Sequence, residues 1–170
     1  AASDVYKRQQ LNTIATSLFK VANDIRLLGS GPRCAIGEIC LPATQPGSSI
    51  MPGKVNPVMS EAVTMVAARI FGNQSTVTWC GANGHFELNV FMPVMSKAIL
   101  ESIELLGSVS EVFSSRCVDG ITANSERCNE LIEYSLSMVT SLAPIIGYEV
   151  AANIAKAVSY THLTLPTSYA

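Results

Sequence analysis

The residues of this sequence best suited to chemistry lie together in residues 47–57, which read GSSIMPGKVNP. The stretch combines two adjacent hydroxyls, an ammonium group and an amide with two glycines and two prolines. Asn56 is a good N-cap residue, Pro57 suits the first helical position, and Glu61 follows one turn later, so we expect a helix to begin here. A donor-rich loop that leads into the positive end of a helix favours binding of a small anion.

The order of these residues resembles the signature loop of the fumarase/aspartase superfamily, GSSxMPxKxNP. Enzymes of this superfamily form or break a C–O or C–N bond beside a carboxylate and release fumarate. Two flanking stretches, GSGPRCAIGEI at 29–39 and HFELNVF at 85–91, make the resemblance one to class II fumarases, which need no iron. His85 stands where the family commonly has Asn, and we interpret it as a turn or interface residue. The resemblance covers residues 11–158 and corresponds to a C-terminal part of a family member.

The resemblance implies reversible hydration of fumarate to L-malate through an aci-carboxylate intermediate. It assigns the base to Ser48. The implied substrate contacts are Ser49, Lys54, Val55 and Asn56. A serine hydroxyl is a poor base at neutral pH unless its alkoxide is stabilised. We expect the backbone N–H groups of residues 47–49, the Lys54 ammonium and the helix end to provide that stabilisation.

Glu61 is the second catalytic residue that the resemblance implies. In the family, the equivalent glutamate pairs with a histidine from another subunit, and the pair handles the water; a carboxylate that orients an imidazole is a familiar acid/base arrangement. The alternative is a carboxylate that only pairs with the helix dipole. We interpret Arg33 and Glu38 as a structural ion pair or surface charges. No metal or other cofactor is implied, and the cysteine run of an iron–sulfur fumarase is missing from this sequence.

Composition narrows the classes of partner. The chain has 170 residues, 48% of them hydrophobic and only 14% charged, and a mean hydropathy of +0.32. These values predict faces buried against partner chains. A net charge of −2 provides no basic field for nucleic acid, and no apolar run approaches the roughly 20 residues that span a bilayer. Five cysteines without C-x-x-C spacing indicate reduced, mostly buried thiols in an intracellular protein, cytoplasmic or, in a eukaryote, mitochondrial.

Apolar residues recur with helical spacing along most of the chain, and no alternating strand pattern competes, so we predict an all-α fold. The expected helices cover residues 11–28, 57–73, 93–113, 125–136 and 149–157. We expect 11–120 to form part of the superfamily's central helical bundle, with the signature loop at 43–56. Residues 121–158 would start the small C-terminal helical domain. Residues 1–10 and 159–170 do not continue the family pattern and are interpreted as non-native tails, and the N-terminus as a cut.

In the family, each active site combines residues from three subunits of a homotetramer. The segments that supply the histidine and other carboxylate contacts precede the resemblance, so this chain alone is predicted to be inactive. One alternative is aspartate ammonia-lyase, whose signature commonly has Ala at the position of Gly53 and which lacks the FELNVF pattern. The other is a non-catalytic helical oligomerisation module, in which the loop would be incidental.

Overall fold

The computed structural model describes residues 2–31 and 33–163, and side chains for 6–31 and 33–158. It divides into two compact units, Ala1–Asn124 (unit 1) and Ser125–Ala170 (unit 2), each described here by itself. The predicted all-α class is confirmed, since the strands found among the described residues are two residues long. In order, the elements are α1 (Ala2–Leu28), β1 (Ile39–Cys40), α2 (Val58–Ala82), α3 (Met92–Arg116), η1 (Val118–Gly120), β2 (Thr122–Ala123), α4 (Ser125–Glu133), η2 (Leu136–Ser141), α5 (Ala143–Ile146) and α6 (Tyr148–Leu163).

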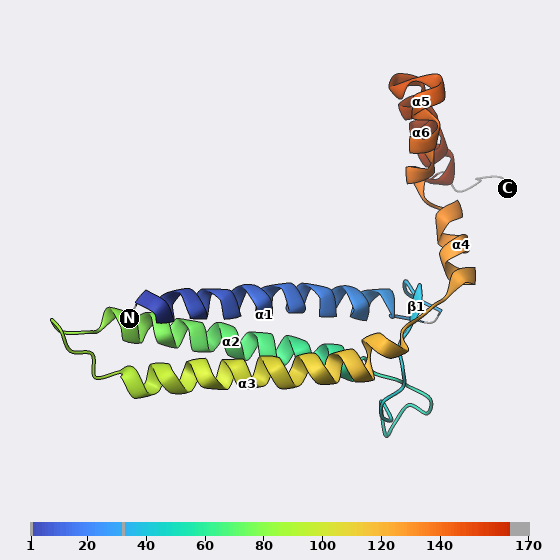
Figure 1. Cartoon of the computed structure of the whole chain (residues 1–170). Helices are drawn as coiled ribbons and strands as arrows, with labels where there is room; N and C mark the ends of the chain where they lie inside the picture. Colours follow the sequence, from blue (N-terminus) through green and yellow to red (C-terminus); the bar gives the residue numbers. More distant parts are fainter. Residues whose placement is uncertain (1, 32, 164–170) are drawn as a thin grey trace. The chain divides into compact units, whose positions relative to one another are not determined.

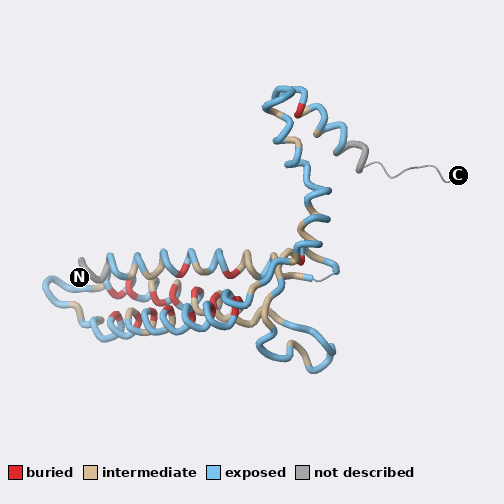
Figure 2. The backbone as a smooth tube through the Cα atoms, turned by 45° about the vertical axis from the view of Figure 1, so that its right-hand side comes forward, coloured by how far each residue is buried: buried red, intermediate tan, exposed pale blue. Residues whose placement is uncertain are grey.

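Unit 1 is built on three long helices that lie side by side, each running antiparallel to the one before it in the sequence (Figure 1). Helix α2 packs against both α1 and α3. Its buried residues recur every three or four positions, as expected of a helix with one face in a core. They are Ser60, Val63, Ala67, Ile70, Asn73, Val77 and Cys80. Figure 2 shows the buried residues of unit 1 gathered where the helices face one another.

The helices of unit 1 are longer than predicted. Helix α1 begins at Ala2 rather than at residue 11, and α2 ends at Ala82 rather than at residue 73. The two extensions are in contact, because the Arg8 guanidinium of α1 donates a hydrogen bond to the Thr78 hydroxyl of α2. The interpretation of 1–10 and 159–170 as non-native tails stays a prediction.

A buried polar cluster sets how α2 lies against α3. The Asn73 side-chain amide donates to the backbone oxygen of Ala98 at 3.2 Å and to the Ser102 hydroxyl at 3.1 Å. It also donates to the Glu101 carboxylate at 3.1 Å, which Arg69 binds with two nitrogens. A buried amide stripped of water needs such partners. Asn73 lies within α2, whereas the sequence predicts that the helix ends near residue 73.

We expect this cluster to make the stability of unit 1 depend on pH. Hydrogen bonds from Arg69 and Asn73 lower the pKa of the Glu101 carboxyl. A group with a lowered folded-state pKa contributes stability that is present above its unfolded pKa and is lost as pH falls through the folded one. Between about pH 6 and about pH 3, we expect the melting temperature to fall less in Glu101→Gln than in the unsubstituted chain.

Thermal unfolding followed by circular dichroism measures this difference. The matched control is Glu104→Gln, which changes an exposed carboxylate on the same helix and should leave the acid sensitivity intact. Equal acid sensitivity in the unsubstituted chain and in Glu101→Gln would show that Glu101 contributes nothing to it.

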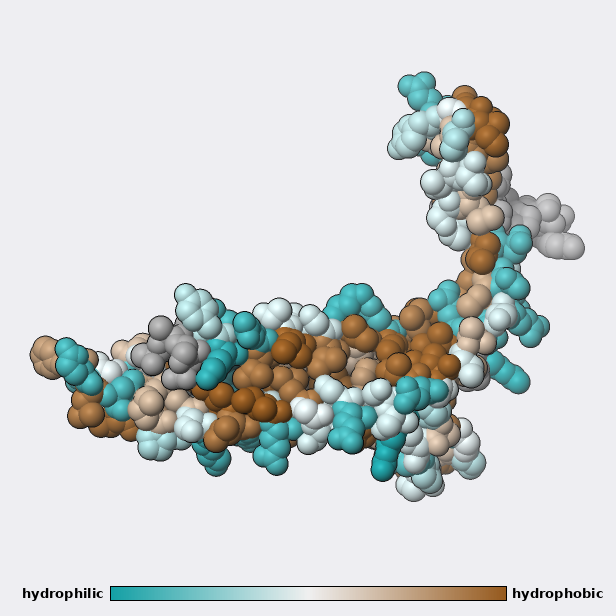
Figure 3. Space-filling model, in the orientation of Figure 1, coloured by the Kyte–Doolittle hydropathy of each residue, from teal (hydrophilic) through white to brown (hydrophobic). Residues whose placement is uncertain are grey.

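Much apolar surface stays uncovered in unit 1. Figure 3 shows apolar side chains along the outer face of the long helices, and Met65 and Trp79 of α2 are 65% and 60% exposed. The sequence contains five cysteines. The expectation that most of them are buried is wrong, since only Cys80 and Cys117 are. Across the described helices, none combines the length and apolarity that crossing a membrane requires.

Candidate functional site

The signature loop is anchored to unit 1 at both of its ends. At its start, β1 pairs antiparallel with β2, which follows η1 at the end of α3; Ile39 faces Ala123 and Cys40 faces Thr122. At its end, the loop enters α2 at Val58. The two-residue strands therefore connect the start of the loop to the segment that follows α3.

The loop closes on itself at a narrow neck. The Gly47 N–H donates to the Lys54 backbone oxygen at 2.9 Å, and the Asn56 side-chain amide donates to the Gly47 carbonyl at 2.7 Å. A Cβ atom on Gly47 would lie 2.4 Å from the Lys54 backbone oxygen. Only glycine fits there, because the obstructing atom belongs to the backbone and cannot turn aside.

Ser48 follows the neck and is half-buried. Its Oγ accepts hydrogen bonds from the N–H groups of Ile50 and Met51, each at 3.1 Å. These donors differ from the backbone N–H groups of 47–49 that we expected to stabilise an alkoxide. The difference arises because the chain turns back over Ser48 within three residues. Two N–H dipoles directed at one hydroxyl oxygen would stabilise negative charge on that oxygen.

A cavity of about 400 Å³ lies on one side of the loop, lined by 43–48 and 53–55. Among the predicted site residues it brings together Ser48, Lys54 and Val55. Thr44 and Gln45 also line it. These two polar residues were not singled out from the sequence, although the predicted loop 43–56 contained them and their side chains offer hydrogen bonds.

Three predicted site residues are outside this cavity lining: Ser49, Asn56 and Glu61. Ser49 is exposed, and Glu61 is half-buried in the first turn of α2, with its N–H bonded to the Pro57 oxygen at 3.0 Å. The prediction that Asn56 caps the helix and that Pro57 is its first residue is wrong. Pro57 occupies the cap position and α2 begins at Val58, because the Asn56 side chain is turned toward Gly47 instead.

His85 lies far from the loop within unit 1. It follows the end of α2, whose 25 residues separate it from the loop by roughly 37 Å at 1.5 Å per residue. It forms a tight turn with Leu88, with N–H to oxygen distances of 2.8 and 3.0 Å. The sequence predicts a turn or interface residue at position 85, and the structure places His85 in a turn.

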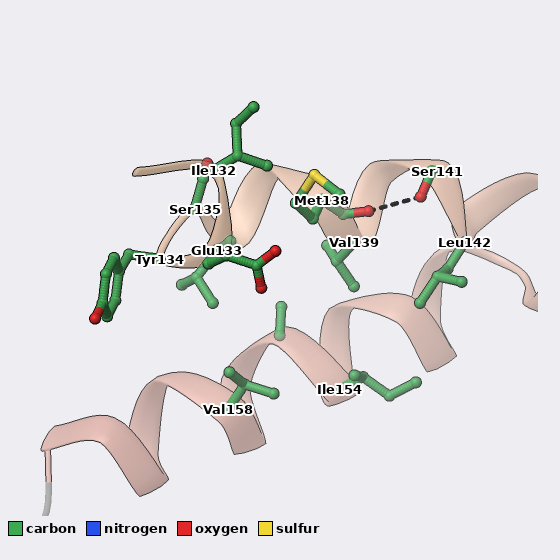
Figure 4. Close-up of a pocket in the computed structure, with 12 residues that line it drawn as sticks. Ile132, Glu133, Tyr134, Ser135, Met138, Val139, Ser141, Leu142, Ile154 and Val158 are labelled. Atoms are coloured by element: carbon green, nitrogen blue, oxygen red, sulfur yellow. Dashed lines mark hydrogen bonds between the residues drawn. The ribbon is translucent and has the colours of Figure 1, made fainter. Parts of the chain in front are cut away.

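Unit 2 contains a second cavity, of about 590 Å³, and it holds none of the predicted site residues. Figure 4 shows its mainly apolar lining, with Val139 and Leu142 facing Ile154 and Val158 of α6. The Ser141 hydroxyl beside it is already bonded to the Met138 oxygen at 2.8 Å. No cluster of three or more His, Cys, Asp or Glu side chains suited to a metal ion occurs in the described part of either unit.

The chain that carries this loop is similar in sequence to known fumarate hydratases. Residues 5–72 match a protein family described as "Lyase". The chain is 61% identical over 146 residues to fumarate hydratase 2 of Arabidopsis thaliana, covering 86% of this chain and 29% of the relative. It is 56% identical over 155 residues to a class II fumarate hydratase of Brucella suis, covering 91% of this chain and 34% of the relative. The resemblance to class II fumarate hydratases is confirmed.

The backbone agrees with the sequence match. A crystal structure of a class II fumarase from Schistosoma mansoni superposes with a TM-score of 0.91 at 39% identity, covering 95% of this chain and 34% of that one. A Brucella melitensis protein described as fumarate lyase:delta crystallin superposes with a TM-score of 0.86 at 49% identity, covering 96% of this chain and 36% of that one. The chain spans about a third of the length of the fumarate hydratases it matches.

Proposed function

We propose that the full-length protein containing this segment catalyses the reversible hydration of fumarate to L-malate. The observation that carries the proposal is the pair of N–H groups on Ser48 Oγ, in a chain similar to class II fumarate hydratases along most of its length. The N–H pair gives an ordinary hydroxyl the electrostatic surroundings that a base of this kind requires.

The difficult step of the reaction is removal of a proton from carbon, because a C–H group beside a carboxylate is a very weak acid. In the malate-to-fumarate direction, Ser48 as alkoxide takes the proton from this carbon, leaving the doubly charged aci-carboxylate. Lys54, which lines the same cavity, places positive charge beside that dianion. Loss of the neighbouring hydroxyl, protonated on its way out as water, then gives fumarate.

The remaining residues are assigned to substrate binding and to the water side of the reaction. Ser49, Val55 and Asn56 are proposed substrate contacts beside Lys54. Glu61, in the first turn of α2, is proposed to orient a histidine from another subunit, and that histidine exchanges the proton of the water. This assignment requires a homotetramer with sites shared between subunits. The uncovered apolar side chains of the long helices support such assembly.

The test uses a chimera in which residues 11–158 of this chain replace the matching third of the Arabidopsis fumarate hydratase. We expect the chimera to hydrate fumarate and the 170-residue chain alone to be inactive, because the segment lacks the other subunits' and upstream contributions to the site. Absorbance of fumarate in the ultraviolet measures both. A soluble, tetrameric chimera without activity would contradict the proposal. Malate dehydration by the 170-residue chain alone would contradict the assignment of a site shared between subunits.

The two alternatives predict different outcomes. Aspartate ammonia-lyase activity would appear as release of ammonia from L-aspartate, assayed beside L-malate with the same chimera. A non-catalytic oligomerisation module would form oligomers, which light scattering would detect. Deleting residues 47–56 would then change neither the number of chains per oligomer nor any binding of a dicarboxylate.

A further inference from the structure

The neck of the signature loop contains a side-chain hydrogen bond that the proposed substrate-binding roles do not explain. Asn56 is grouped above with the substrate contacts, yet its amide already donates to the Gly47 carbonyl at 2.7 Å in a partly buried hydrogen bond. The bond joins residues nine positions apart and crosses the base of the loop. We propose that Asn56 is a positioning residue, which holds Ser48 in place by closing the loop through Gly47.

The hydrogen bonds of the loop form one connected set. Gly47 is bonded on both sides, since its N–H donates to the Lys54 oxygen and its carbonyl accepts from Asn56. The Lys54 N–H in turn donates to the Met51 oxygen at 3.3 Å, and the Met51 N–H donates to Ser48 Oγ. The plane of the peptide between Gly47 and Ser48 is therefore fixed by the Asn56 amide. Releasing that amide frees the residue that carries the proposed base.

The chemistry of the side chain makes the role testable. An amide donates a hydrogen bond, whereas an ionised carboxylate of the same shape only accepts. In Asn56→Asp, a carboxylate oxygen would face the Gly47 carbonyl oxygen and repel it. Below the carboxyl pKa of about 4, the protonated acid regains a donor and the neck can close again. If Asn56 acted only at the helix end, aspartate would serve as well as asparagine.

The experiment measures amide hydrogen exchange by NMR on the 170-residue chain, as protection factors of Gly47 and Met51. In Asn56→Asp at pH 7, we expect protection to fall by about two- to tenfold, the equivalent of one hydrogen bond, and to recover near pH 3.5. Gly47→Ala should lower it equally, because its Cβ cannot pass the Lys54 oxygen. The control is Gly72→Ala, an exposed site in α2 where an added Cβ meets nothing within 4 Å.

Two exchange results would overturn the inference: unchanged protection in Asn56→Asp, or no protection of Gly47 in the unsubstituted chain. The chimera adds a kinetic measurement, because the inference rests on the proposed function for its catalytic meaning. A positioning role predicts that Asn56→Asp lowers kcat about tenfold or more with KM changed less than about twofold. A raised KM with unchanged kcat would make Asn56 a substrate contact alone. An inactive chimera would count against the proposed function and leave the exchange result standing.

Discussion

Replacing Ser48 by alanine in the chimera is expected to lower kcat by about 10²–10⁴-fold, the usual contribution of a general base. The physical reason is that, among the residues the structure describes, no other hydroxyl receives the Ile50 and Met51 N–H groups at 3.1 Å. KM should change little, because Lys54 and the remaining loop groups that we propose to bind the dicarboxylate are unaltered. The melting temperature should also change little, since Ser48 lies on a loop and is only half-buried.

The matched control for this substitution is Ser110→Ala, which removes an exposed hydroxyl from α3 in the same unit. It should leave kcat and KM as they are. A second comparison is Ser49→Ala, whose hydroxyl is exposed and is proposed to touch substrate, so its effect should be on KM. A Ser48→Ala chimera with the unsubstituted turnover number would remove Ser48 from the role of base.

The largest loss of stability is expected from Ile70→Ala. Ile70 lies near the middle of α2, is 2% exposed, and packs in one cluster with Ala15 of α1 and Leu106 of α3. Truncation removes apolar burial from both helix contacts and leaves a cavity, at a cost of about 2–5 kcal/mol. Domains of this size are stable by only about 5–15 kcal/mol, so unit 1 would lose a large fraction of its free energy of unfolding.

Urea unfolding followed by far-ultraviolet circular dichroism measures this cost. Met65→Ala is the control, because Met65 is on the same helix and 65% exposed in the single chain. Its effect should stay within about 0.5 kcal/mol, as for other surface substitutions. Equal losses for the two variants would mean that the face of α2 carrying Ile70 is not the core of unit 1.

The sequence by itself determined the helical class and the identity of the loop. Helical spacing of apolar residues needs only local periodicity, and α1, α2 and α3 all formed where that spacing predicted a helix. The order GSSIMPGKVNP at 47–57 was specific enough to point to class II fumarases, which the relatives then confirmed. Helix ends were predicted less well, because the residues near them bond to partners on other helices that local periodicity does not reveal. Arg8 bonds to α2 and Asn73 bonds to α3.

The tertiary structure decided which partner the Asn56 side chain takes. Asn56 followed by proline has the composition of a helix cap, but the Gly47 carbonyl, nine residues away, takes its amide. The donors on Ser48, by contrast, are local, because they come from Ile50 and Met51, two and three residues further along the chain. A side chain with several possible partners bonds to whichever the folded backbone brings within about 3 Å, and local sequence preference does not specify that distance.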